Sequence, residues 1–477
     1  MAQVKIRSLW QSRPAWVAPL VVGLVAALSL YVAERIFQSR NADWLPDGLR
    51  IHDMSSNNSQ QNMTLWDMNV FGIRSLWYDH IYPPLMDFIR FQFMQIDTRG
   101  GGSTSPIEVD RRLHVLFAAL FGVVTSVVYL WVRDLTKSGW WALGASFIWA
   151  IAPASIITMT LLEPTPLAIS SIAVTFYLLY RFLKTRKLGY ATGFFAALLI
   201  ASLSRNAVQI HVLVILAIAV IAFWFMSKNR SWWIQGLNIM LVALIFVWPV
   251  RSQIMFSTFD VSSHTGYHRS GALWIDPKSV PETPDTVYPQ NILENGPVFS
   301  SAFNTQEILR ENYRLTRAAN DFMMQHPVEA VQRMIDSVKI TSENALTPVS
   351  VTTRNYMIEG VFWKSTYEFM LSGWRYLLLV LASAAVIIWS RGWRGTKQLM
   401  MKYGWFAAFW ILIAIPVAFS NRYWTAEGET AGPFHTEASR LKGLIEIPVY
   451  SLVVYALWIV VQKINIRWKE SQSVTQD

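Results

Sequence analysis

Long uninterrupted apolar runs dominate this sequence and limit what the chain can fold into. A helix needs about 20 apolar residues to cross the hydrocarbon core of a bilayer, which is about 30 Å thick. Runs that approach or exceed this length lie near 15–37, 111–132, 139–161, 165–183, 189–204, 207–226, 232–250, 373–390, 403–420 and 443–462. Because these runs are continuous, they favour helices over alternating membrane strands. We predict an all-α polytopic membrane protein with about ten transmembrane helices.

The composition agrees with this class and excludes several others. Charged residues make up 15% of the chain, against roughly 25% in soluble domains. The net charge of +10 is explained by Lys and Arg retained in cytoplasmic loops, so no nucleic-acid partner is expected. The chain has no cysteine, which excludes disulfides and thiolate metal sites. It also has no Walker, dinucleotide or HExxH motif, so ATP-driven and dinucleotide mechanisms are unsupported.

The distribution of Lys and Arg predicts the orientation. If the N-terminus is inside, every second connection is also inside, and these connections hold most of the cations between the spans. The cations are Arg133, Lys137, Arg181, Lys184, Arg186, Lys187, Lys228, Arg230, Arg391, Arg394, Lys397 and Lys402, with Lys463, Arg467 and Lys469 in the tail. No small-residue cleavage site closes the first apolar run, so we expect a retained span and not a signal peptide.

Two long segments then lie outside the membrane. The first, about 38–110, begins with a polar piece and becomes aromatic and amphipathic from Phe71 to Met94, which is typical of interfacial helices. The second, about 251–372, starts rich in proline and later has helical periodicity in Glu307–Gln325 and from His326-Pro327 to Lys339. It predicts a small, mostly helical outer domain.

These boundaries divide the chain into three parts. We expect residues 1–250 to form an N-terminal transmembrane module that includes the outer loop 38–110, and we predict that this module is the catalytic one. Residues 251–372 form an extracytoplasmic domain. Residues 373–477 form the C-terminal transmembrane helices and a cytoplasmic tail.

The first outer loop contains ionisable residues among apolar neighbours, in the stretch Thr64–Gln95. Asp67 follows Trp66, and Asp79 and His80 precede the rigid sequence Tyr82-Pro83-Pro84. Charges in such surroundings usually have a partner or a function. Asp67 is our first candidate for a catalytic base, with Asp79 as its competitor and His80 and Tyr82 as substrate-binding candidates. The alternative for Asp67 is a helix cap.

Further candidates lie in the other outer connections. Glu163 is the acid between spans three and four, and Arg205 interrupts the apolar stretch between spans five and six. An arginine suits a lipid phosphate because its planar fork matches phosphate oxygens, although it can also extend to the headgroups. The last outer connection adds candidates for phosphate (Arg440, Lys442) and substrate (His435, Glu437). The alternatives for Glu163 and for this connection are a polar turn and a solvated loop.

The order of several short motifs resembles the GT-C superfamily of polyprenyl-phosphate-sugar glycosyltransferases. The bacterial branch related to the protein O-mannosyltransferases and the lipid A aminoarabinose transferase is the most similar. The motifs are Asp67, Tyr82-Pro83-Pro84-Leu85, Asp110-Arg111-Arg112-Leu113, Glu163-Pro164, Ser204-Arg205, His326-Pro327-Val328-Glu329-Ala330 and His435-Thr436-Glu437-Ala438-Ser439-Arg440. Asp67-Met68 stands where many members have Asp-Glu, and the last motif continues Arg440-Leu441-Lys442.

The resemblance implies an inverting sugar transfer on the outer face of the bacterial inner membrane. The donor is a polyprenyl-phosphate-linked sugar and the acceptor a glycan, lipid or protein. Asp67 would accept the acceptor proton, Glu163 would orient the acceptor or help hold a divalent cation, and the cations Arg205, Arg440 and Lys442 would stabilise the leaving phosphate. No cofactor follows with certainty, because some relatives use a metal and others do not.

Two other functions stay open at this point. An O-antigen polymerase or ligase also has large outer loops, but it relies mainly on outer arginines and a histidine. A flippase for lipid-linked saccharides would place ionisable residues near the membrane midplane, and this sequence has few within its predicted spans.

Overall fold

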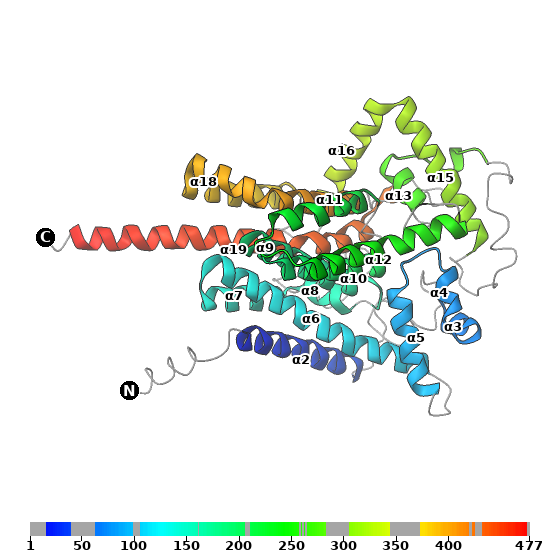
Figure 1. Ribbon diagram of the computed structural model, residues 1–477, viewed down its shortest axis with the longest axis horizontal. Coiled ribbons are helices and arrows are strands. Elements are labelled where there is room, and N and C mark those ends of the chain that lie inside the picture. Colours follow the sequence, from blue (N-terminus) through cyan, green and yellow to red (C-terminus); the bar gives the residue numbers. More distant parts are fainter. Residues whose placement is uncertain are drawn as a thin grey trace.

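The computed structural model describes residues 16–39, 63–98, 105–160, 162–205, 210–256, 259, 262, 265–282, 305–343, 373–418, 422–424 and 432–474. In this part of the chain the regular structure is helical apart from one pair of short strands (Figure 1). Five segments are long and apolar enough to cross a membrane. They are Val17–Arg35 in α2 (Val17–Ser39), α6 (Pro106–Thr136), α9 (Thr165–Thr185), α12 (Trp232–Phe256) and Leu444–Trp468 in α19 (His435–Val474). The all-helical membrane class is confirmed, and the count of ten spans stays a prediction.

Shorter helices occupy other predicted spans. They are α7 (Gly139–Ile151), α8 (Pro153–Thr160), α10 (Leu188–Ser204) and α11 (Ile210–Met226). The third predicted span, 139–161, is not one helix: α7 ends at Ile151 and α8 begins at Pro153. Proline interrupts the helix because it lacks an amide hydrogen and clashes with the preceding turn. The break between the fifth and sixth predicted spans is confirmed, since α10 ends at Ser204.

The predicted spans 373–390 and 403–420 correspond to one long element, α18 (Gly373–Ala418), which turns at Gly392. Gly392 has φ 66° and ψ 172°, a backbone conformation that side chains disfavour. Ile387, before the turn, packs against Ala456 of α19. Trp410, after the turn, donates a 3.1 Å hydrogen bond to the carbonyl oxygen of Ile445. The second half of α18 therefore returns along α19.

The core of the helical bundle surrounds α9, which is buried along almost its whole length. Phe176 of α9 contacts Phe409 of α18, and Phe194 of α10 contacts both Phe409 and Phe223 of α11. These rings meet with centroids 5.2–5.8 Å apart, within the range that aromatic pairs prefer. The aromatic contacts join the consecutive helices α9, α10 and α11 to α18, which is distant from them in sequence.

Small residues let α2 approach α6 closely. A Cβ atom added to Gly122 would lie 2.5 Å from the carbonyl oxygen of Gly23, and one added to Gly23 would collide with Ser126. The Ser126 hydroxyl donates a 2.8 Å hydrogen bond across this contact to the carbonyl oxygen of Pro19. Such contacts are common where membrane helices pack, because close backbones gain van der Waals contact.

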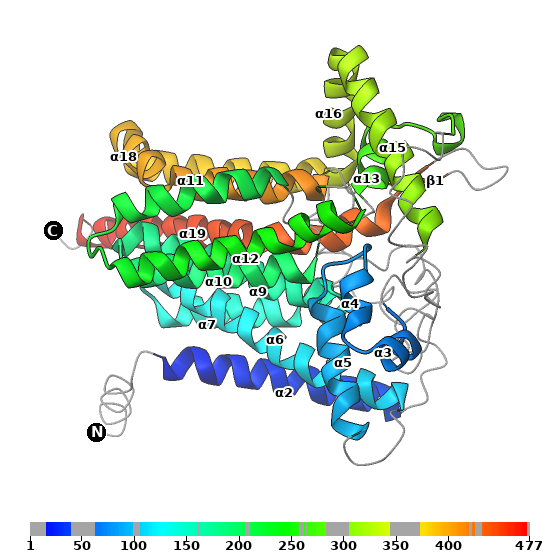
Figure 2. The ribbon, with the colours of Figure 1, turned by 45° about the vertical axis from the view of Figure 1, so that its right-hand side comes forward.

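The shorter helices outside the bundle gather at one of its ends, which we call the loop end (Figure 2). It comprises the described residues of 63–98, 265–282 and 305–343. Its elements are α3 (Leu65–Phe71), α4 (Arg74–Tyr78), α5 (Leu85–Thr98), α13 (Thr265–Ala272), η2 (Pro277–Ser279), α15 (Gln306–Gln325) and α16 (Pro327–Glu343). The helices predicted within Phe71–Met94, at Glu307–Gln325 and after His326 are confirmed. The polar piece at 57–62 lies outside the described residues.

The loop end also holds the short strands β1 (Arg422–Trp424) and β2 (Gly432–Phe434). They pair antiparallel, with Tyr423 opposite Pro433, and lead into α19. Leu273, Ala319 and Ala330 form a small apolar core beneath α13, α15 and α16. The boundary at 250/251 falls inside α12, which continues to Phe256.

The α2–α6 contact yields a prediction about stability. Gly122→Ala should destabilise the protein by about 1–3 kcal/mol, because the added methyl overpacks a backbone contact. The matched control is Gly144→Ala on α7, where an added Cβ meets nothing within 4 Å. Thermal unfolding of both variants in detergent measures the difference. An equal melting temperature for the two variants would contradict the close α2–α6 contact.

Candidate functional site

The turn between α4 and α5 places two titratable groups in a buried position. Asp79 ends α4, and its Oδ1 accepts a 2.9 Å hydrogen bond from the amide of Ile81. An Asp that binds the backbone two residues further on forms a compact local turn. Asp79, His80 and Tyr82 are all buried, and Pro83 and Pro84 restrict the chain that follows.

A buried arginine from α12 lies beside this turn. Arg251 is 2% exposed, and its Nη2 donates to the carbonyl oxygen of Trp77. Its guanidinium carbon lies 4.2 Å from the Trp248 ring centroid and 4.7 Å from that of Phe256. The His80 ring meets Phe256 edge-on at 5.5 Å. α12 therefore contributes one wall of the site.

Asp79 and Arg251 are close enough to interact electrostatically, yet their side chains are not hydrogen bonded to each other. Within the described residues, Oδ2 of Asp79 and both Nε and Nη1 of Arg251 have no hydrogen-bond partner. Buried polar atoms without partners are costly and rare. This pair therefore offers one acceptor and two donors to a bound group.

Burial shifts both titratable groups of the turn. It raises the pKa of Asp79 to about 8, and the nearby carboxylate of Asp87 contributes to the rise. Burial lowers the pKa of His80 to about 3, with a further contribution from the positive charge of Arg251. The charged form is disfavoured in each case because water is excluded. His80 is neutral at physiological pH, and Asp79 exchanges its proton near that range.

Glu163 and Arg205 meet on the other side of the turn. The guanidinium Nη1 of Arg205 lies 3.7 Å from Glu163 Oε2 and donates to the Thr165 hydroxyl. Thr165 in turn donates a 2.8 Å hydrogen bond to Glu163 Oε1. The guanidinium carbon of Arg205 is 6.0 Å from the ring centroid of Tyr82. Three residues named from sequence (Tyr82, Glu163 and Arg205) are thus brought together.

Asp67 occupies a different environment. Thr64 caps α3, accepting a 3.1 Å hydrogen bond from the Asp67 amide and donating a 2.7 Å bond to Asp67 Oδ2. The N-cap of α3 is therefore Thr64, and Asp67 is the third residue of that helix. The alternative that Asp67 itself caps a helix is wrong, and its catalytic role stays a prediction.

The sequence motifs did not predict a buried ion pair between Asp87 and Arg90, which we call the Asp87–Arg90 clasp. Asp87 accepts hydrogen bonds from the Met63 amide at 3.1 Å and from Arg90 Nη1 at 2.7 Å. Arg90 Nη1 also donates a 2.6 Å bond to the carbonyl oxygen of Met63. Both side chains are buried. The i, i+3 spacing of Asp87 and Arg90 was the one available sign of this pair.

Arg251 was also missed as a site residue. It directly follows the apolar run 232–250, and a cation at that position usually indicates the end of a membrane span. The continuation of α12 to Phe256 places it inside the protein. The charge at the end of a membrane helix was a signal, but only the fold decides that it is buried.

The candidates in the last connection lie at the start of α19. His435, Glu437, Arg440 and Lys442 occupy its first turns, directly after β2. The positions of their side chains lie outside the described residues, so their predicted roles stay predictions. Within the described part, no group of three or more His, Asp or Glu side chains could hold a metal ion.

The described residues form one chemical unit around the turn at 79–84. It holds a carboxyl group with a raised pKa, a neutral histidine, and a buried arginine on each side of the turn. Such a unit can bind an anion and exchange a proton in the same place. Comparison with protein-family models, curated proteins and solved structures finds no match to this chain.

The raised pKa of Asp79 predicts how stability depends on pH. Between pH 3.8 and about 8 the folded protein holds a proton that the unfolded chain releases, so wild-type stability falls as pH rises through this window. The Asp79→Asn variant has no ionisable group at this position. Its free energy of unfolding relative to wild type should therefore increase as the pH rises through this window, by up to about 1.4 kcal/mol per pH unit. Thermal unfolding in detergent at several pH values measures this trend.

Asp321→Asn is the control, because Asp321 is exposed on α15. It should show no such trend. A difference between wild type and Asp79→Asn that stays constant with pH would contradict the raised pKa.

The Asp87–Arg90 clasp yields a second prediction. Arg90→Met leaves a buried carboxylate without its cation and should cost about 3–5 kcal/mol of unfolding free energy. The double variant Asp87→Asn with Arg90→Met should recover part of the loss, since no charge is then stranded. Arg111→Met is the matched control. The side chains of Arg111 and its partner Glu108 are 45% and 34% exposed, so this ion pair contributes about 0–1 kcal/mol to the unfolding free energy. Denaturant unfolding distinguishes the variants, and an equal cost for Arg90→Met and Arg111→Met would contradict a structural clasp.

Proposed function

We propose that this chain is an inverting glycosyltransferase that moves a sugar from a polyprenyl phosphate to an acceptor hydroxyl at the loop end. The observation that carries the proposal is the buried pair Asp79 and Arg251. Asp79 Oδ2 has no hydrogen-bond donor, and Nε and Nη1 of Arg251 have no acceptor, within the described residues. The acceptor hydroxyl would donate a hydrogen bond to Asp79, and the phosphate oxygens of the donor would accept hydrogen bonds from Arg251.

In the proposed reaction the acceptor oxygen attacks the anomeric carbon and its proton moves to a carboxylate. The bond from that carbon to the phosphate oxygen breaks, and the lipid phosphate leaves with one more negative charge. Arg251 and Arg205 would stabilise this charge, because fixed donors act strongly in a site without water. The sugar configuration inverts in a single displacement.

Asp79 and Asp67 compete for the role of base. The raised pKa of Asp79 supports it, because a base is most effective when its pKa lies near the working pH. Asp67 is the residue that the motif order indicates. Glu163 would act through Arg205, which it positions with Thr165. Arg440, Lys442, His435 and Glu437 remain candidates for the donor phosphate and substrate.

The proposal includes the membrane orientation. Cations from the connections at 133–138, 181–188, 227–231 and 391–402 belong to the end opposite the loop end, and positive charge is retained in the cytoplasm. The loop end would then face the exterior of the bacterial cytoplasmic membrane. Lipid-linked sugars, with a glycan, lipid or protein acceptor, are the proposed substrates.

Substitution of the two acids tests the proposal. In proteoliposomes with polyprenyl-phosphate-linked sugars, Asp79→Asn should lower transfer by about 10²–10⁴-fold, the usual contribution of a general base. Asp67→Asn should retain most of its activity, and wild-type kcat/KM should rise with pH up to about 8. The exposed variant Asp321→Asn controls for expression and handling. If Asp67→Asn abolishes transfer and Asp79→Asn does not, the assignment of the base is reversed.

Full transfer activity in both variants would contradict a carboxylate base in the first outer loop. Loss on Arg251→Gln or Arg205→Gln alone would then favour a polymerase- or ligase-type enzyme. Movement of a lipid-linked saccharide across the vesicle without any sugar transfer would identify a flippase and overturn the proposal.

A further inference from the structure

The end of the bundle opposite the loop end is strongly basic. We call it the basic end and define it by the connections 133–138, 181–188, 227–231 and 391–402. These connections hold twelve Lys and Arg residues and one acid, Asp134. The connections meet in space: the Lys228 amide donates a 3.0 Å hydrogen bond to the carbonyl oxygen of Arg186.

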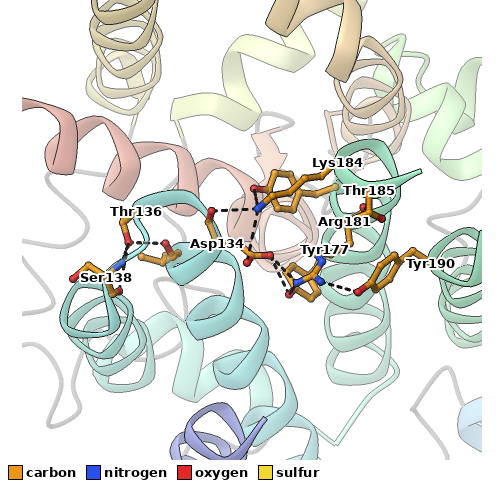
Figure 3. A network of polar contacts seen from close by, with 10 residues as sticks. Asp134, Thr136, Ser138, Tyr177, Arg181, Lys184, Thr185 and Tyr190 are labelled. Carbon is orange, nitrogen blue, oxygen red and sulfur yellow. Dashed lines mark hydrogen bonds and ion pairs between the residues drawn. The ribbon is translucent and has the colours of Figure 1, made fainter. Parts of the chain in front are cut away.

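Asp134 is already occupied by neighbouring groups (Figure 3). Its Oδ2 accepts a 2.9 Å hydrogen bond from Arg181 and a 3.4 Å bond from the Tyr177 hydroxyl. Lys184 lies 3.8 Å from its Oδ1, and Arg181 also donates to Tyr190 at 2.7 Å. The one acid of these connections is therefore used to join α6, α9 and α10.

Three of the other cations lie near Tyr403 of α18. Arg186 and Arg391 are both close enough to act electrostatically on its hydroxyl, as is the occupied Asp134. The Lys402 ammonium lies 5.6 Å from the Tyr403 ring centroid. Tyr403 itself stacks on Tyr180 of α9 with centroids 5.8 Å apart.

One further contact and one buried donor belong to the same surface. Arg391 Nη2 donates a 2.9 Å hydrogen bond to the hydroxyl of Tyr455 on α19. Arg186 Nη1 is buried and has no hydrogen-bond partner within the described residues. We call Arg186, Arg391, Lys402, Tyr403 and Tyr455 the Tyr403 cluster. It combines three cations from α9 and α18 with two tyrosine hydroxyls from α18 and α19.

Exposed tryptophans indicate where the basic end is expected to meet the lipid headgroups. Five indole side chains at or next to the four connections are more than half exposed. They are Trp140 (83%), Trp232 (78%), Trp233 (91%), Trp389 (59%) and Trp393 (78%). Tryptophan is enriched where membrane helices reach the interface, because its ring is apolar and its N–H is polar. The cations of the same connections are therefore expected near the depth of phospholipid phosphates.

We propose that the Tyr403 cluster binds the phosphate of an anionic phospholipid headgroup. Guanidinium groups match phosphate oxygens, and charge-assisted hydrogen bonds are among the strongest in proteins. Basic groups beside membrane helices attract anionic lipid. The bound phosphate would join the C-terminal pair α18–α19 to α9, since Arg186 belongs to the end of α9 and Arg391 to the turn of α18. This inference is independent of the reaction at the loop end.

The test uses the full chain in lipid nanodiscs. Thermal stability and retained lipid are measured in phosphatidylcholine alone, in phosphatidylcholine with phosphatidylglycerol, and in phosphatidylcholine with inorganic phosphate added. Arg186→Gln and Arg391→Gln are the site variants. Arg394→Gln and Lys397→Gln are matched controls, because they remove the same charge from exposed positions of the same connection.

Phosphatidylglycerol should raise the melting temperature of wild type and of both controls by several degrees. The site variants should lose at least half of that rise and retain less phosphatidylglycerol in native mass spectrometry. If a site variant does not fold, Lys402→Gln replaces it, since Lys402 is an exposed member of the Tyr403 cluster. An equal rise in site and control variants would show diffuse attraction and overturn the proposal. No rise, or a rise reproduced by inorganic phosphate, would overturn it too.

Discussion

The carbonyl oxygen of Trp77 accepts a hydrogen bond from Arg251, and this contact joins the first loop to the last turn of α12. The Ser262 hydroxyl makes a second such contact with the carbonyl oxygen of Ile81. The two donors follow their acceptors in the sequence by 174 and 181 residues. The position of Asp79 relative to the bundle depends on them, because the turn itself fixes only its local geometry.

Burial at this turn has a cost that the rest of the fold must offset. Asp79 and Arg251 each keep polar atoms without a partner among the described residues, and burial raises the Asp79 pKa. A fold optimised for stability alone would pair these groups or replace them with apolar ones. Strain of this kind is typical of sites that bind ligands. The buried Asp87–Arg90 pair differs, since both carboxylate oxygens of Asp87 are hydrogen bonded and the pair joins α5 to Met63.

The two ends of the bundle use charge differently. At the loop end, arginines are buried with single acids and aromatic rings, so each charge acts strongly on its neighbours because the surroundings have a low dielectric constant. At the basic end, twelve cations share one acid, which is bonded to Arg181 and approached by Lys184. The other cations belong to connections that contain or adjoin five exposed tryptophans. The proposed reaction belongs to the loop end, and the proposed lipid contact belongs to the basic end.

The sequence by itself determined the helical membrane class, the ends of α10 and α15, and five of the residues that meet at the turn, because apolar length and isolated charges are local properties. Asp79, His80, Tyr82, Glu163 and Arg205 were all identifiable from their apolar surroundings. Only the tertiary structure decided that α12 continues to Phe256 and that Arg251 is buried there. It also decided that Arg251 and Ser262 bond to the carbonyl oxygens of Trp77 and Ile81. These features depend on contacts between segments that are distant in the sequence, and a local sequence pattern does not contain that information.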